Sequence, residues 1–264
     1  LCSIQIRDFD YRKAEEPAKK ALAINPRSLS SLSALASSYW QMGNRTAYEK
    51  VRKNVFETNP VYGEFYLTVA RACEHKRRNE EAIELLKQAI LLKPDYAPAL
   101  TRIGILLMRE GEEKEAESYL RKSFRLDNYN PRTTNFINLL EHMKRNFVST
   151  RTEHFLIKWD REKGAVLRFF LPEYAEQVYE EVCEEFDYEP KNPTLLEIFD
   201  SHDRFSARIA GLPFIATVGA SLGKVVAADS PKRALFDWKN VLRHEFVHVV
   251  KLQQSKIQIP FWFT

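Results

Sequence analysis

The chain has 264 residues, of which 44% are hydrophobic and 29% charged, and its formal net charge is +4. This length is enough for two domains with cores of their own, and no apolar run in the sequence approaches the roughly 20 residues that a membrane-spanning helix needs. The small positive charge comes without a nucleic-acid-binding motif, and three cysteines at unrelated spacings exclude a disulfide scaffold and a cysteine-based zinc ribbon.

Residues 1–147 carry a 34-residue period. Pro26, Pro60 and Pro94 are spaced by 34 residues, and Asn128 stands at the next position of this period. Small residues recur in phase where two helices of a repeat would touch: Ala14, Ala82 and Ala116; Ala21, Ala89 and Ser123; Ala36, Ala70 and Gly104. This pattern resembles the tetratricopeptide repeat. We therefore predict an all-α solenoid of one half repeat, three full repeats and a terminal helix at residues 131–147 that covers the last apolar face.

Two details of this repeat region remain open. The first repeat is represented only by its second helix, from about Asp8, so we expect the chain to be cut at its amino end. Tyr48 stands where the repeat favours alanine, which leaves the packing of its helix uncertain. The resemblance implies a concave surface that binds a peptide or protein partner and that has no catalytic role.

The periodicity changes near Val148, and residues 148–264 predict a second domain. Its expected elements follow an α+β order. They are a strand at 153–159, a helix at 165–186 with a break or new start at Pro172, a strand at 194–199, a helix capped by Asp200 or Ser201 that ends near Ala210, one or two strands within 216–228, and a helix that starts between Pro231 and Asp237.

The last of these helices carries the motif H-E-F-V-H at residues 244–248. His244 and His248 are four residues apart, so on a helix both imidazoles project from one face and can bind one metal ion. Glu245 lies beside them and can act on a water molecule as a general base. The flanking apolar residues predict a buried helix, in which two histidines and a glutamate are costly unless they are paired or bind a metal. Core-facing or solvated histidines are the alternative.

The stretch H-E-F-V-H-V-V-K-L-Q-Q…I-P-F-W-F-T resembles the gluzincin metallopeptidases, specifically the peptidase-MA-like domains of bacterial proteins with tetratricopeptide repeats. The resemblance implies an incomplete zincin-like α+β domain that binds Zn²⁺ through His244 and His248, with Glu245 as the catalytic residue. It also implies that a glutamate directly after Thr264, outside this chain, is the third ligand, so that residues 1–264 alone are inactive. The segment 216–228 would include the edge strand along which such enzymes align an extended substrate; an ordinary sheet strand is the alternative.

These observations predict a zinc metallopeptidase whose repeats recruit a protein substrate or partner. The first alternative is a repeat-based interaction scaffold with an inactive metallopeptidase-like domain, and the second is a metal hydrolase acting on a non-peptide amide. We predict no nucleic-acid partner and no membrane segment; the compartment is open, an extracytoplasmic site in a bacterium being one option. The remaining polar candidates are interpreted as surface or capping residues: His154, His202 with Asp203, and the acidic run Glu180, Glu181, Glu184 and Glu185.

Overall fold

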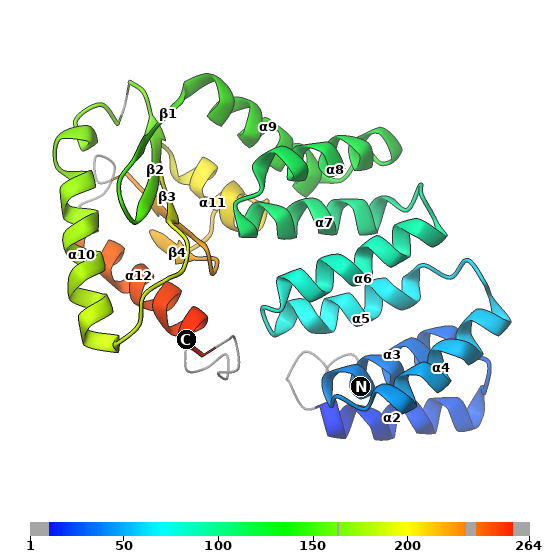
Figure 1. The fold of residues 1–264 in the computed structure, drawn as a ribbon. Coiled ribbons are helices and arrows are strands. Elements are labelled where there is room, and N and C mark those ends of the chain that lie inside the picture. The colour runs from blue at the N-terminus through cyan, green and yellow to red at the C-terminus, as the bar shows by residue number, and fades with distance from the viewer. Residues whose placement is uncertain (1–10, 163, 231–235, 256–264) are drawn as a thin grey trace. The chain divides into compact units, whose positions relative to one another are not determined.

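Figure 1 shows the fold of the chain, a computed structural model that describes residues 11–162, 164–230 and 236–255. The chain divides into two compact units, residues 1–103 and residues 104–264. Each unit is described separately.

The first unit consists of antiparallel helix pairs. Its helices are α2 (Tyr11–Ile24), α3 (Leu29–Gln41), α4 (Arg45–Thr58), α5 (Glu64–His75), α6 (Asn79–Leu92) and the beginning of α7 (Ala97–Glu110). Local signals set their ends, since Ser28 caps α3, Asn44 caps α4, and Gly43 turns the chain between them with a φ of 73°. The predicted helix pairs of the repeats are confirmed here.

Tyr48 packs well although the repeat favours alanine at its position. Its side chain is 2% exposed, and its ring lies 4.7 Å from that of Trp40 and 5.7 Å from that of Phe65. Phe65 in turn contacts Phe56 and Tyr66. A cluster of aromatic rings therefore replaces the close helix contact that a small residue would allow.

The second unit begins with the rest of α7, α8 (Glu113–Leu126) and α9 (Pro131–Asn146). Gly104 is required by close packing, because a Cβ there would lie 2.5 Å from Leu120 Cγ. The terminal helix differs from the prediction in two ways. It ends at Asn146, and besides contacting α8 it buries Leu139 and Met143 against Phe199 of the sheet. Covering the last apolar face of the repeats is thus only part of its role.

A five-stranded mixed sheet forms the centre of this unit. Its strands are β1 (Phe147–Arg151), β2 (Phe155–Asp160), β3 (Thr194–Phe199), β4 (Gly219–Ser221) and β5 (Val225–Asp229), in the spatial order β1-β2-β3-β5-β4. The three central strands are parallel, and β1 and β4 pair with them antiparallel at the two edges. The predicted strand at 194–199 is confirmed, and the segment 216–228 forms the hairpin of β4 and β5.

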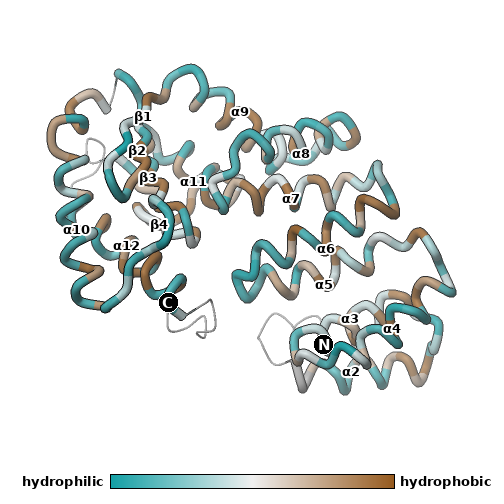
Figure 2. The backbone as a smooth tube through the Cα atoms, in the orientation of Figure 1, coloured by the Kyte–Doolittle hydropathy of each residue, from teal (hydrophilic) through white to brown (hydrophobic). Residues whose placement is uncertain are grey.

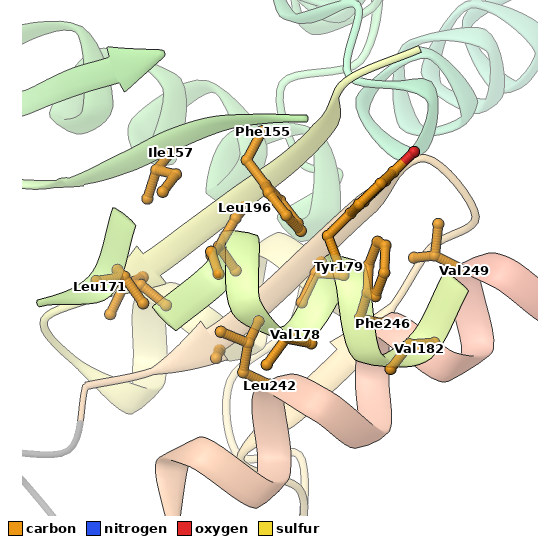
Figure 3. Packing of buried hydrophobic residues seen from close by; sticks show 14 of the residues in the cluster. Phe155, Ile157, Leu171, Val178, Tyr179, Val182, Leu196, Leu242, Phe246 and Val249 are labelled. Atoms are coloured by element: carbon orange, nitrogen blue, oxygen red, sulfur yellow. The ribbon is translucent and has the colours of Figure 1, made fainter. Parts of the chain in front are cut away.

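One face of the sheet packs against α10 (Leu171–Phe186) and α12 (Trp238–Gln254). Alternate residues of the strands point into this core, where Phe155 and Leu196 meet Phe246 of α12 (Figure 3). The 3₁₀ helix η1 (Leu167–Phe169) precedes α10, and Pro172 stands in the first turn of α10, so this proline marks a new start. The outer side of α10 is hydrophilic (Figure 2), and it carries the exposed acidic run predicted as a solvated face.

The other face packs against α9 and α11 (His202–Ala210) and contains buried charges. Arg208 of α11 donates to Glu197 of β3 at 2.6 Å, and both side chains are fully buried. Arg208 also donates to the carbonyl oxygen of Met108 at 2.8 Å, and Lys158 pairs with Glu113 at 2.5 Å. The end of α7 and the start of α8 are therefore joined to the sheet within the second unit, so the predicted domain border at residues 147 and 148 lies inside a compact unit.

Candidate metal centre

Helix α12 carries the candidate metal ligands and is fixed by its apolar side. Asp237 caps its first turn by accepting a hydrogen bond from the Asn240 backbone N–H at 3.1 Å. Leu242, Phe246 and Val249 are buried against α10 and the sheet (Figure 3). Because this side of the helix is anchored, the orientation of the histidines on its other side is set by the 3.6-residue period.

The two histidines of the motif point at a common position. His244 Nε2 and His248 Nε2 are 3.0 Å apart, and the two rings are perpendicular with centroids 4.6 Å apart. Two imidazole nitrogens at metal–nitrogen distances of about 2.0–2.1 Å around one zinc ion lie roughly 3.0–3.4 Å apart. The pair therefore fits a shared metal ion, and His244, which is exposed, leaves this position open to solvent.

Glu245 lies on the side of α12 that faces the edge strand β4. Its side chain is buried, and its Cγ and Oε1 atoms approach Gly219 of β4. The motif thus places two histidines and one glutamate on adjoining faces of one helix, with the glutamate held between the helix and the end of the sheet.

Two histidines leave a zinc site short of a protein ligand. Among residues 11–162, 164–230 and 236–255, no group of three metal-ligating side chains includes His244 and His248. The third ligand that the sequence predicts lies outside the described residues, since it is placed after Thr264.

A second cluster of potential ligands was not predicted. His142 of α9, Asp160 at the end of β2 and Asp200 after β3 bring their ligand atoms within 4.8 Å of one another. His142 Nε2 is 3.7 Å from a carboxylate oxygen of each aspartate, and Arg204 donates to Asp200 at 2.7 Å. The three residues are far apart in sequence and on different elements, so no local spacing in the sequence predicts the cluster.

The tautomer of His142 can be inferred from its contact with Asn146. The Asn146 side-chain amide donates to the His142 carbonyl oxygen at 3.0 Å and lies 2.9 Å from His142 Nδ1. Since that amide nitrogen is a donor, Nδ1 accepts and the ring proton is on Nε2. In this tautomer the Nε2–H faces the two carboxylates, with 3.7 Å from Nε2 to the nearest oxygen of each.

The other histidines considered have structural roles. His154 Nδ1 is 2.6 Å from Glu176, and its ring stacks on Tyr179 with centroids 3.6 Å apart. His202 is the first residue of α11, where Ser201 is the N-cap; its two ring nitrogens contact Asp229 and the Ile215 carbonyl oxygen. Both histidines are therefore partly buried and held by other residues, unlike the surface or capping residues that we predicted.

Comparison with known proteins concerns the helical part of the chain. Residues 53–131 match the tetratricopeptide repeat family model. Anaphase-promoting complex subunit 3 of Schizosaccharomyces pombe is 24% identical over 118 residues, which are 45% of this chain and 18% of that protein. This chain therefore spans less than a fifth of the length of that relative.

Two solved structures are similar to about half of this chain. A thermophilic tetratricopeptide-repeat protein of Thermus thermophilus shows 23% identity and a TM-score of 0.37, covering 52% of this chain and 75% of its own. The pilF protein of Pseudomonas aeruginosa shows 20% identity and a TM-score of 0.39, covering 55% of this chain and 66% of its own. Among the described residues, no helix is long and apolar enough to span a membrane. Residues 53–131 of the helical part therefore match tetratricopeptide repeats, and a small mixed sheet follows the helices.

Proposed function

We propose that this protein is a zinc-dependent peptidase whose tetratricopeptide repeats recruit a protein substrate or partner. The observation that carries the proposal is the 3.0 Å approach of His244 Nε2 and His248 Nε2 on a helix whose Glu245 is held against the sheet. A tetratricopeptide repeat forms a surface for a partner, so the chemistry belongs to the second unit.

In this proposal His244 and His248 hold the zinc ion, and a third ligand comes from beyond Thr264. When bound, zinc polarises a carbonyl group and lowers the pKa of water. The Glu245 carboxylate accepts a proton from the attacking water and passes it to the nitrogen of the leaving amine. The burial of Glu245 beside β4 limits the motion of its side chain, which supports its role as a positioned base.

The first test is the zinc content of the full-length gene product, together with the residue that follows Thr264. We expect a glutamate there and one zinc ion per chain. A different residue, without a histidine or carboxylate nearby and without bound zinc, would contradict the proposal.

The second test separates ligands from base. His248→Ala should abolish zinc binding, because His244 would be the only histidine ligand left. Glu245→Gln should keep the zinc ion and lose turnover by about 100-fold or more, because the amide cannot accept the proton. Cleavage of a peptide library measures turnover, and product identification separates peptide bonds from other amides. Loss of zinc in Glu245→Gln would contradict the assigned roles.

A second candidate function is a protein-interaction scaffold with an inactive second unit. The family match at residues 53–131 favours it, because such repeats commonly bind peptides or proteins on their concave side. This reading predicts that the repeats retain a partner whether or not His244 and His248 are present. Pull-down with the wild type and the His244→Ala/His248→Ala variant, followed by a zinc-dependent cleavage assay of the captured partner, distinguishes the two functions.

A further inference from the structure

We propose that Gly219 is a positioning residue: its missing side chain lets β4 press against α12 and fix the carboxylate of Glu245. The inference rests on the proposed function, in which Glu245 moves a proton. It concerns the geometry of that residue and adds a specific contact from another part of the chain.

The backbone of β4 around Gly219 is held in place. β4 pairs antiparallel with β5, with Gly219 opposite Ala228. The Asp229 backbone N–H donates to the Val218 carbonyl oxygen at 2.8 Å, and Thr217 Oγ1 donates to the Gly219 carbonyl oxygen at 2.7 Å. The strand therefore cannot move easily away from the helix to make room for a side chain.

The position allows no side chain. A Cβ atom at Gly219 would lie 2.5 Å from Val241 Cγ1, 3.1 Å from Glu245 Cγ and 3.2 Å from Glu245 Oε1. Val241 and Glu245 are four residues apart on α12, so both face the strand. The φ of Gly219 is outside the left-handed region, so glycine is needed here for space and not for backbone conformation.

This contact selects Glu245 among the residues of the motif. The three atoms nearest to the added Cβ belong to Val241 and Glu245, and none belongs to His244 or His248. Adding a methyl group should therefore displace the carboxylate and leave the two imidazoles in place. A misplacement of 1 Å costs about 100-fold, so a shift of the carboxylate by a few tenths of an ångström should lower turnover by about 10-fold or more.

The test uses the full-length, zinc-loaded protein and the variant Gly219→Ala. We expect kcat to fall 10- to 100-fold with an unchanged zinc content and a KM within about threefold of the wild type. Ala220→Gly is the control, because Ala220 packs on the opposite face of the sheet; it should lower the melting temperature without a comparable loss of kcat.

A second set of variants separates positioning from general packing. Val241→Ala removes the atom 2.5 Å from the added Cβ, so Gly219→Ala/Val241→Ala should recover most of the melting temperature and keep the low kcat. The melting temperatures of Gly219→Ala, Glu245→Ala and the double variant form a thermodynamic cycle that needs no activity. The double variant should lose less melting temperature than the sum of the losses of the two single variants. Glu245→Ala removes Cγ and Oε1, the two Glu245 atoms that the added Cβ would contact.

Recovery of kcat together with melting temperature in Gly219→Ala/Val241→Ala would overturn the inference, as would additive melting temperatures in the cycle with Glu245→Ala. An active wild type with an equally active Gly219→Ala would also overturn it and leave the proposed function intact. A full-length protein that binds zinc and cleaves nothing would overturn the proposed function, and the positioning role would fall with it.

Discussion

Glu197 is a buried acid in β3 whose ionisation affects the stability of the fold. Burial raises the pKa of its carboxyl to about 7, although the guanidinium of Arg208 lowers it. Glu113 raises it further by contributing a second acidic group at the same place. The ionised form of Glu197 is therefore disfavoured in the folded protein despite its partner.

The raised pKa predicts a stability that falls as the pH rises. Glu197 binds its proton more tightly in the folded chain, where its pKa is about 7, than at the ordinary value of 4.5. Its favourable contribution is thus complete below pH 4.5 and is lost as the pH rises through 7, by up to about 3 kcal/mol. Urea unfolding at pH 5, 6, 7 and 8 should show this loss in the wild type and a flatter profile in Glu197→Gln; parallel profiles would refute it.

Arg208 is predicted to matter more for stability than an exposed arginine. Its side chain is buried between Glu197 and the Met108 carbonyl oxygen, at 2.6 Å and 2.8 Å. At pH 8, where Glu197 is ionised, Arg208→Met leaves a buried carboxylate without its cation, which costs about 3–5 kcal/mol. Arg145→Met is the control, since Arg145 is exposed on α9, and it should change the free energy of unfolding by less than about 1 kcal/mol. Similar effects of the two substitutions in urea unfolding would contradict this reading.

At the scale of the elements, the end of α11 depends on a glycine for two reasons. Gly211 closes the helix with a φ of 68°, and a Cβ there would lie 2.7 Å from Phe136 Cε2. The helix end is thereby packed directly against α9, which also donates from Asn135 to the Gly211 carbonyl oxygen at 2.9 Å.

Substitution of two glycines separates these reasons. Gly211→Ala introduces backbone strain and also a clash with the ring of Phe136, so we expect the free energy of unfolding to fall by about 2–4 kcal/mol. Gly223 also has a positive φ, of 95°, but a Cβ there meets nothing within 4 Å, so Gly223→Ala should cost only about 1 kcal/mol. Thermal unfolding of both variants measures the difference, and equal losses would show that the contact with Phe136 is unimportant.

The elements with strong local signals were predicted from the sequence. The strand β3 is a short and mostly apolar run, Ser201 caps α11, and Asp237 precedes α12. The strand β1 was missed, because F-V-S-T-R is short, partly polar and becomes a strand only by pairing with β2. The helix at 131–146 was predicted, but its contact with the sheet was not, since helical periodicity does not identify the partner of an apolar face.

The residues of the candidate site also include some that the sequence predicts and some that it does not. His244 and His248 are four residues apart, so the helical period alone predicts their common direction, with Glu245 on the adjoining face. Gly219 precedes them by more than twenty residues and has no side chain to suggest a role. The cluster of His142, Asp160 and Asp200 exists only because α9, β2 and β3 meet in space. Residues that converge through tertiary packing leave no signal in local spacing.

In the molecule as a whole, two ion pairs join the end of α7 and the start of α8 to the sheet. Lys158 pairs with Glu113 and Lys224 with Glu110, at 2.5 Å and 2.9 Å. The turn between α7 and α8 also lies close to the sheet, since a Cβ at Gly111 would lie 3.4 Å from Leu195. The second unit accordingly begins at Gly104.

These contacts predict how the chain can be divided. A fragment of residues 97–264 retains α7, α8 and α9 and should unfold cooperatively. A fragment of residues 148–264 lacks α9 and uncovers Phe199 and Phe205, so we expect it to bind a hydrophobic dye and to lose a cooperative transition. Circular dichroism and dye fluorescence on heating compare the two, and a cooperative transition in the shorter fragment would contradict this border.

The anchoring of the turn between α7 and α8 has an evolutionary consequence. Repeat arrays change length by duplicating or deleting whole units, and each such change is tolerated only where a unit contacts nothing but its neighbours. The unit that contains Glu110 and Glu113 does not meet this condition, because Lys224 and Lys158 of the sheet pair with it. Relatives of this protein should therefore vary in the number of repeats before Ile103 and keep one invariant repeat directly ahead of the sheet.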